Sequence, residues 1–156
     1  MKSFIFCQSR TELYPGVDVV EVVIVDTLPK ALGHRAVLLR HSGWIGYLKL
    51  LLKSLSRARV FYFSQRAGHI TACGTIALGF CNHYPVSSDS AVIGSIWTDQ
   101  RCRGQGLASK GIRAAINHMI SEGISTFYID TQETNLAMLK AIEKTGFGKP
   151  VDNFEI

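Results

Sequence analysis

One short segment restricts the fold of this chain more than any other: Arg101–Gly106, with the sequence RCRGQG, lies between a strand pattern and a helical pattern. Residues 91–97 are rich in valine and isoleucine and predict a strand. Apolar residues at helical spacing predict a helix over residues 104–122, ended by Gly123. Two glycines let the backbone approach a ligand closely, and the beginning of a helix offers free N–H groups to an anion. The segment therefore predicts an anion-binding turn, for which a pyrophosphate is the most suitable ligand.

The spacing of this turn excludes two common phosphate-binding motifs. No Gly-Lys-Ser/Thr follows it, as a P-loop requires. Gly104 and Gly106 are followed by Ser109 where a dinucleotide-binding fingerprint has its third glycine. The turn thus belongs to another class of anion site.

The remaining patterns predict one domain, residues 1–156, of the α/β class. Strands are expected at residues 3–8, 59–65, 70–80, 91–97, 126–130 and 151–156, and helices at residues 43–55, 104–122 and 135–145. Residues 17–26 fit either type, because their β-branched content favours a strand and their apolar spacing also fits a helix. The order strand, helix, strand, helix in the second half predicts parallel strands joined by a right-handed crossover.

A second pattern follows the glycine turn: Asn135, an amphipathic helix, and then Lys144-Thr145-Gly146-Phe147. In this order, the two patterns resemble the signatures of the GCN5-related N-acetyltransferases (GNAT), over residues 70–147. The resemblance implies an acyltransferase with a central mixed sheet, flanked by helices, in which two parallel strands splay apart. It implies acetyl-CoA as cosubstrate, no metal, and direct attack of a primary amine in a ternary complex. It also makes residues 17–26 the first helix.

The same resemblance assigns the cofactor-binding residues. The strand backbone near Ile96, Trp97 and Thr98 would pair with the pantetheine arm or donate to the oxyanion, and Asn135 would lie on the facing side. The pyrophosphate would meet the glycine turn and the helix that follows it: Arg101, Arg103, Gly104, Gln105, Gly106, Leu107 and Ala108.

The catalytic groups depart from the family pattern. Many members have a tyrosine seven residues after the asparagine, which protonates the leaving thiolate; here that position is Ile142, which has no proton to donate. Tyr84 and Tyr128 are the side chains considered for that role, beside a water or no acid at all. The usual glutamate base falls at Ser90, so the base candidates are the neighbouring Asp89 and then His83, which can titrate near neutral pH.

Charge gives the expectations about partners. The net charge is +5, and residues 27–88 contain no carboxylate but eight Lys and Arg residues. Such a region attracts anions. It favours an anionic small-molecule acceptor, such as a nucleotide-linked amino sugar, over a polyamine; a peptide amine is also possible. Alternatives are an acidic acyl carrier protein as donor, a CoA-binding module without catalysis, and an anionic membrane surface at residues 43–55. No nucleic-acid motif is present.

The cysteines and the end of the chain complete the expectations. Cys7, Cys73, Cys81 and Cys102 show neither metal-ligand nor disulfide-framework spacing, which indicates reduced thiols in a cytoplasmic protein. Only nine residues follow Phe147, enough for one strand but not for the C-terminal hairpin usual in the family. We therefore expect an open sheet edge, which a homodimer could cover.

Overall fold

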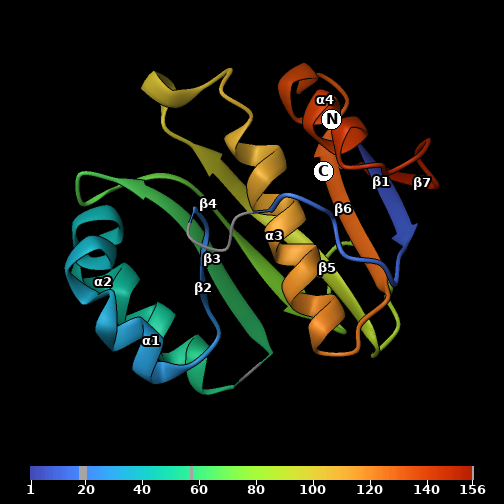
Figure 1. Ribbon diagram of the computed structural model, residues 1–156. Helices are drawn as coiled ribbons and strands as arrows, with labels where there is room; N and C mark the ends of the chain where they lie inside the picture. The colour runs from blue at the N-terminus through green and yellow to red at the C-terminus, as the bar shows by residue number, and fades with distance from the viewer. Residues whose placement is uncertain (18–20, 57, 156) are drawn as a thin grey trace.

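The computed structural model describes residues 1–17, 21–56 and 58–155 (Figure 1). Within these residues the strands form one sheet in the order β2-β3-β4-β5-β6-β1-β7. The strands are β1 (Lys2–Ser9), β2 (Val23–Val25), β3 (Arg59–Arg66), β4 (His69–Leu78), β5 (Ser90–Thr98), β6 (Thr126–Gln132) and β7 (Asp152–Glu155). The helices are α1 (Leu28–Gly33), α2 (Arg35–Leu55), α3 (Leu107–Ser121) and α4 (Leu136–Lys144), with a 3-10 turn, η1 (Gln100–Cys102).

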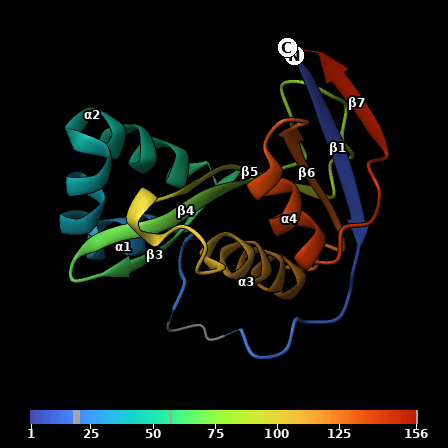
Figure 2. The same cartoon turned by 90° about the horizontal axis from the view of Figure 1, so that it is seen from above.

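The helices cover both faces of this sheet, as Figure 2 shows. Helices α1 and α2 pack on β2, β3 and β4 around buried Leu38 and Phe63. Helix α3 packs on the opposite face around Ile116, Ile93 and Phe127, and α4 lies beside α3 over β6. The predicted α/β class, with a mixed sheet flanked by helices, is confirmed.

The predicted splay between two parallel strands is also present. Strands β5 and β6 pair in parallel from Ser90 with Thr126 to Ile93 with Ile129, and no further. Beyond that point the two strands no longer pair with each other, although β5 stays paired with β4 and β6 with β1. Ser95, with a φ of 50°, lies where β5 turns away, close to a register shift in its pairing with β4. After Ile93, the side of β5 that faces β6 is therefore free to meet a ligand.

The helix that the resemblance implied for residues 17–26 is wrong where the structure describes it. Residues 18–20 lie outside the described residues, but Val23–Val25 form the edge strand β2, antiparallel to β3. The β-branched residues of this segment favour a strand, which is stabilised by pairing with Phe61–Phe63 and by burial of Val25. The first helix is α1, with a proline in its first turn.

Helix α2 contains the helix predicted for residues 43–55 and begins earlier, at Arg35. Gly43 interrupts it with a φ of 69°, so residues 35–42 and 44–55 run in two directions. A glycine takes this backbone conformation with little cost, whereas other residues are strained by it. The sequence prediction therefore recognised the segment after the kink alone.

On the side of β6 the sheet continues with two more strands, so its edge on that side lies at β7. Strand β1 lies between β6 and β7 and pairs with both in antiparallel fashion. The expected last strand is present as Asp152–Glu155; Ile156 lies outside the described residues. The N-terminal strand thus supplies the neighbour of β6, and a homodimer that covers the edge at β7 stays a prediction. None of the described helices is long and apolar enough to cross a membrane.

Candidate active site

The anion-binding turn predicted from the sequence forms the N-terminal end of α3. Gly104 and Gly106 have φ values of 78° and 74°, and a Cβ at either position would meet nothing within 4 Å. Backbone conformation, and not space, is therefore what requires glycine here. No side chain caps this helix end, and its first turn has no acidic residue. Its first N–H groups and the positive end of the helix dipole remain available to an anion.

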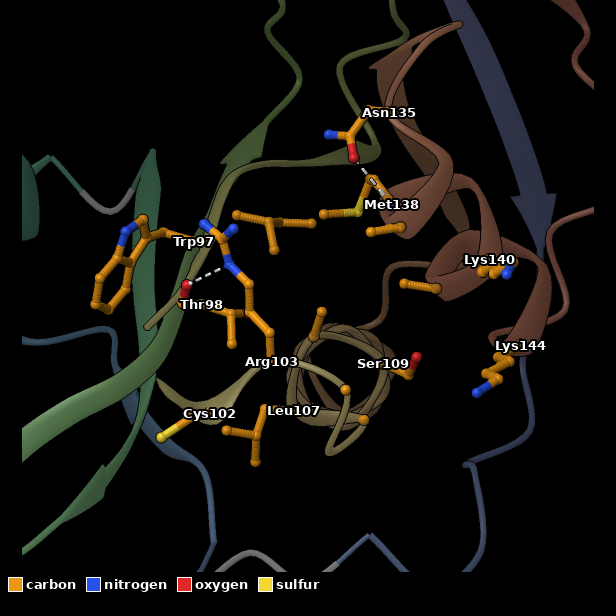
Figure 3. A pocket seen from close by; sticks show the side chains of 16 residues that line it. Trp97, Thr98, Cys102, Arg103, Leu107, Ser109, Asn135, Met138, Lys140 and Lys144 are labelled. Carbon is orange, nitrogen blue, oxygen red and sulfur yellow. Dashed lines mark hydrogen bonds between the residues drawn. The ribbon is translucent and has the colours of Figure 1, made fainter. Parts of the chain in front are cut away.

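Hydrogen bonds fix the turn to the end of β5. The backbone N–H of Asp99 donates to the carbonyl of Thr71 over 2.8 Å, and the carboxylate of Asp99 accepts from the N–H of Arg101, also over 2.8 Å. The guanidinium of Arg103 reaches back and donates to the carbonyl of Thr98 over 3.5 Å (Figure 3). The turn thus holds Arg103 beside the open end of β5.

A cavity of about 450 Å³ lies between this turn, the end of β5 and α4 (Figure 3). It is lined by Ile96, Trp97, Thr98, Cys102, Arg103, Gly104, Gly106, Leu107, Ala108, Ser109, Asn135, Ala137, Met138, Lys140, Ala141 and Lys144. Of the predicted cofactor-binding residues, Arg101 and Gln105 are not in this lining. Arg101 instead borders a neighbouring hollow with Trp97 and Arg103, and Gln105 is exposed between the two glycines.

Asn135 lies beside the cavity and also begins α4. Its side-chain oxygen accepts a hydrogen bond from the N–H of Met138 over 3.2 Å, which is a helix cap. This explains why a residue of this type precedes the helix, apart from any contact with a cofactor.

Two lysines of the lining were not predicted from the sequence. Lys140 and Lys144 are four residues apart on α4, so they lie on one side of the helix, and both line the cavity. Arg113 of α3 donates to the carbonyl of Lys144 over 2.6 Å and holds the two helices together there. The i, i+4 spacing of the two lysines can be read from the sequence and indicates a basic side of α4. Only the fold shows that this side of α4 lies across the cavity from the glycine turn. Together with Arg103, the lysines make a cavity for an anion.

The four predicted catalytic residues lie outside this lining, near one another on the opposite face of the sheet. Tyr128 alternates along β6 with Phe127 and Ile129, which pack under α3, so its side chain points to the other face. The ring of Tyr84 lies 6.2 Å from that of Tyr128. His83 stacks on Phe154 of β7, with ring centroids 5.1 Å apart.

Asp89 lies just before β5, at the end of the strand away from the turn. Ile96 comes seven positions later in the chain, which is roughly 20 Å along a strand. Burial, the neighbouring Cys7 and then the charge of Asp89 raise the pKa of Tyr128. The structure thus brings Asp89 near Tyr128, but not near the cavity.

Sequence reasoning missed another carboxylate, Asp130, at the point where the sheet splits. It is the first residue of β6 after the last pair with β5, and it alternates to the same face as Tyr128. The hydroxyl of Tyr84 donates to its carboxylate over 3.0 Å. Burial and the charge of Asp130 raise the pKa of Tyr84 well above its usual value, so the phenol keeps its proton. Its place in the split, which the sequence does not reveal, makes Asp130 a candidate for accepting a proton.

His41 of α2 contacts Trp97, which lines the cavity, and also Cys73 of β4. The ring of His41 lies 4.9 Å from that of Trp97, and its Nε2 lies 3.7 Å from the sulfur of Cys73. Burial raises the pKa of Cys73 to about 11, so its thiol stays protonated. Partial burial lowers the pKa of His41, which favours a neutral imidazole at pH 7.

Ile142, where the family often has tyrosine, is fully buried in the core.

Comparisons with known proteins agree with this geometry. No curated protein matches the chain in sequence. Among solved structures, an acetyltransferase of the GNAT family from Novosphingobium aromaticivorans aligns with a TM-score of 0.62 and 19% identity, over 98% of this chain and 62% of that one. A GNAT acetyltransferase from Colwellia psychrerythraea aligns with a TM-score of 0.65 and 20% identity, over 94% and 52%. The chain thus spans less than two thirds of the length of these two proteins.

A third structure, AAC(6')-Iy in complex with the bisubstrate analogue CoA-S-monomethyl-acetylneamine, aligns with a TM-score of 0.60 and 16% identity, over 86% of this chain and 96% of that one. The sequence profile described as "Acetyltransferase (GNAT) family" matches residues 40–147, more than half of the chain. The glycine turn, the split strands and the cavity all lie within or next to that match. The chain belongs to the acetyltransferase (GNAT) family.

Proposed function

We propose that this protein transfers the acetyl group of acetyl-CoA to a primary amine. The observation that carries the proposal is the cavity where the uncapped end of α3 meets the end of β5 that no longer pairs with β6. Its free N–H groups suit a pyrophosphate, and three cationic side chains surround it, Arg103, Lys140 and Lys144. That AAC(6')-Iy binds a CoA-containing analogue in a related fold supports this choice of ligand.

Within this proposal, each wall of the cavity has one task. The N–H groups of Leu107 and Ala108, with Arg103, bind the pyrophosphate, and Lys140 and Lys144 pair with phosphate oxygens. Backbone groups of β5 from Ile96 to Thr98 that face away from β4 hold the pantetheine arm as a neighbouring strand would. The acetyl group then lies at the split between β5 and β6, where Asp130 is the first residue of β6 past their last pair.

The chemistry needs a neutral amine and a stabilised oxyanion. The amine nitrogen forms a bond to the acetyl carbon, and the carbon–sulfur bond breaks to release CoA as its thiolate, which takes a proton from solvent. Asp130 accepts the proton of the amine, held in place by the hydrogen bond from Tyr84. An N–H of β5 at Ile96 or Trp97 donates to the oxyanion. No covalent enzyme intermediate is required, because binding in a ternary complex supplies proximity.

The acceptor that we propose is an anionic small molecule, such as a nucleotide-linked amino sugar. The basis is the stretch of residues 27–88, which lacks carboxylates and includes α2, whose His41 contacts Trp97 of the cavity. A positive surface beside the split favours an acceptor that carries phosphates and disfavours a polyamine.

We also place the protein in the cytoplasm, because its four cysteines, all within the described residues, are free thiols.

The first experiment is thermal unfolding with acetyl-CoA, free CoA and a long-chain acyl-CoA. A ligand present at about 100 times its Kd adds roughly 2.7 kcal/mol of stability, which is easily detected. Stabilisation by acetyl-CoA supports the cavity assignment. No stabilisation by any of the three contradicts it, and salt-sensitive binding of an acyl carrier protein would then favour that donor.

An amine panel then tests the reaction. Turnover of anionic amino compounds above polyamines is the expected result. Efficient acetylation of a polyamine with none of an anionic amine overturns the acceptor class. Stabilisation by acetyl-CoA without turnover of any amine indicates a CoA-binding module without catalysis. That alternative is favoured by Ile142, which stands where many family members have a catalytic tyrosine.

A further inference from the structure

The second half of α2, residues 44–55, presents more apolar surface than the fold uses. Tyr47 and Ser54 are buried against the sheet, and Leu50 and Leu51 are half-buried beside them. The hydroxyl of Tyr47 donates to the carbonyl of Ala31 over 3.2 Å, which fixes this side of the helix inward. These residues account for the packing of α2 on β3 and β4.

A second apolar side of the same helix faces solvent. Its side chains are between 49% and 71% exposed: Trp44, Ile45, Leu48, Leu52 and Leu55. At about 100° per residue they occupy one continuous sector beside the buried one. We call these five residues the outer apolar face. Single exposed apolar residues are ordinary, but a contiguous group of large ones marks an interaction site.

Positive charge borders the outer apolar face on its far side. Lys49 and Lys53 follow it around the helix, and neither forms an ion pair with any described residue. No carboxylate occurs in the sequence between residues 27 and 88, so nothing on α1, α2, β3 or β4 neutralises these lysines. The expected partner therefore combines an apolar layer with negative charge.

The position of the helix selects among such partners. Figure 1 shows α2 at the outer edge of the molecule, beyond β3 and away from α3 and α4. A helix there offers a convex surface, which suits a deformable layer better than a rigid groove. A second copy of the chain would bring the same unneutralised lysines together, which is unfavourable.

We propose that the outer apolar face docks on the surface of an anionic phospholipid bilayer. Trp44 and the leucines enter the boundary between headgroups and acyl chains, while Lys49 and Lys53 contact anionic headgroups. Interfacial helices with tryptophan and leucine on one side and lysine beside them bind in this way. The proposal is independent of the reaction that the cavity performs.

Vesicle flotation tests the proposal with the full chain at 0.1 M salt. We expect the protein to float with phosphatidylcholine vesicles that contain phosphatidylglycerol, and to remain behind with pure phosphatidylcholine. The double variant Leu48→Gln/Leu52→Gln should bind at least tenfold more weakly. Its matched control is Leu13→Gln/Leu136→Gln, which changes two leucines that are also exposed but lie outside α2; it should bind like the unaltered protein.

Charge has its own pair of variants. A basic residue at an anionic surface contributes about fivefold to binding. Lys49→Gln/Lys53→Gln should therefore weaken binding about 25-fold, whereas Lys110→Gln/Lys149→Gln, with the same loss of charge elsewhere, should change it little. Circular dichroism of every variant shows whether it is folded.

Fluorescence gives a second readout that does not depend on a polar substitution. With Trp97→Phe, Trp44 is the remaining tryptophan, and its emission should shift to shorter wavelength with anionic vesicles. Absence of flotation and of the shift overturns the proposal. Equal loss in the control variants also overturns it, since binding would then not be specific to α2. A dimer in sedimentation equilibrium that Leu48→Gln/Leu52→Gln abolishes would assign the face to a second copy instead.

Discussion

At the scale of single residues, two carboxylates compete for the role of base. Asp89 was the choice from the sequence, and Asp130 is the one at the split, paired with Tyr84. Asp130→Asn keeps the size and polarity of the side chain but removes its basicity. We expect kcat to fall by about 10²- to 10⁴-fold, with stabilisation by acetyl-CoA unchanged, as measured by steady-state kinetics and thermal unfolding.

Asp89→Asn is the matched control, because Asp89 is exposed and lies at the other end of β5. Near-normal kcat is expected for this variant. A larger loss in Asp89→Asn than in Asp130→Asn would return the base to the residue that the sequence favoured.

His41 offers a pH-dependent signal at the same scale. Its pKa is lowered by partial burial, and its ring lies 4.9 Å from that of Trp97. Because its folded-state pKa lies below that of the unfolded chain, the unfolded state binds more protons as pH falls below about 6.5. We expect stability to decrease over that range down to the folded-state pKa, and His41→Gln to remove this part of the decrease. Urea unfolding between pH 5 and 8 measures it; an identical pH profile in the variant contradicts the assignment.

At the scale of elements, the end of α3 is defined by backbone conformation. Gly106→Ala puts a side chain at a φ of 74°, which costs about 1 kcal/mol or somewhat more. Relief of that strain would move the N–H groups that we assign to the pyrophosphate. We therefore expect a lower Tm and weaker binding of acetyl-CoA, by calorimetry. Gly148→Ala is the control, since Gly148 also has open space but no positive φ; equal effects in both variants would contradict the argument.

The elements also show how far the sequence could predict this fold. The glycine turn, the strands around it and α3 follow from local patterns, because turn chemistry and periodicity act within a few residues. Residues 23–25 form a strand because β3 offers an edge with which they pair. The resemblance to the family had implied a helix there. The helix before Gly43 was not predicted, because helical spacing was recognised in residues 43–55 alone.

At the scale of the whole molecule, the order of the strands in the sheet depends on pairing between segments far apart in the sequence, which local patterns do not reveal. Residues 3–8 were predicted as a strand, but nothing local says that this strand lies between β6 and β7. The candidate site has the same limit. The turn was predicted, whereas Lys140, Lys144 and Asp130 are functional candidates only because α4 and β6 meet β5 in space.

The position of β1 can be tested through the core. Phe6 is buried under α3 and α4, and its removal should cost about 3–5 kcal/mol in urea unfolding. Phe80, half-exposed in the loop after β4, serves as the control; Phe80→Ala should change stability by less than about 0.5 kcal/mol. A cost for Phe6→Ala as small as that for Phe80→Ala would mean that β1 does not complete the sheet.

The charge distribution of the whole molecule leads to the last prediction. A net charge of +5, with residues 27–88 free of carboxylates, creates an attraction for anions that acts before contact is made. Salt screens such attraction, since the Debye length falls from about 8 Å at 0.15 M to about 3 Å at 1 M. For an anionic amine, KM should therefore rise several-fold between 0.05 M and 0.5 M salt while kcat changes little. A neutral amine of similar size should show a flat KM over the same range, because its encounter with the split is not steered. If both acceptors respond equally to salt, the effect belongs to acetyl-CoA at Arg103 and the two lysines, and the positive stretch has no part in choosing the acceptor.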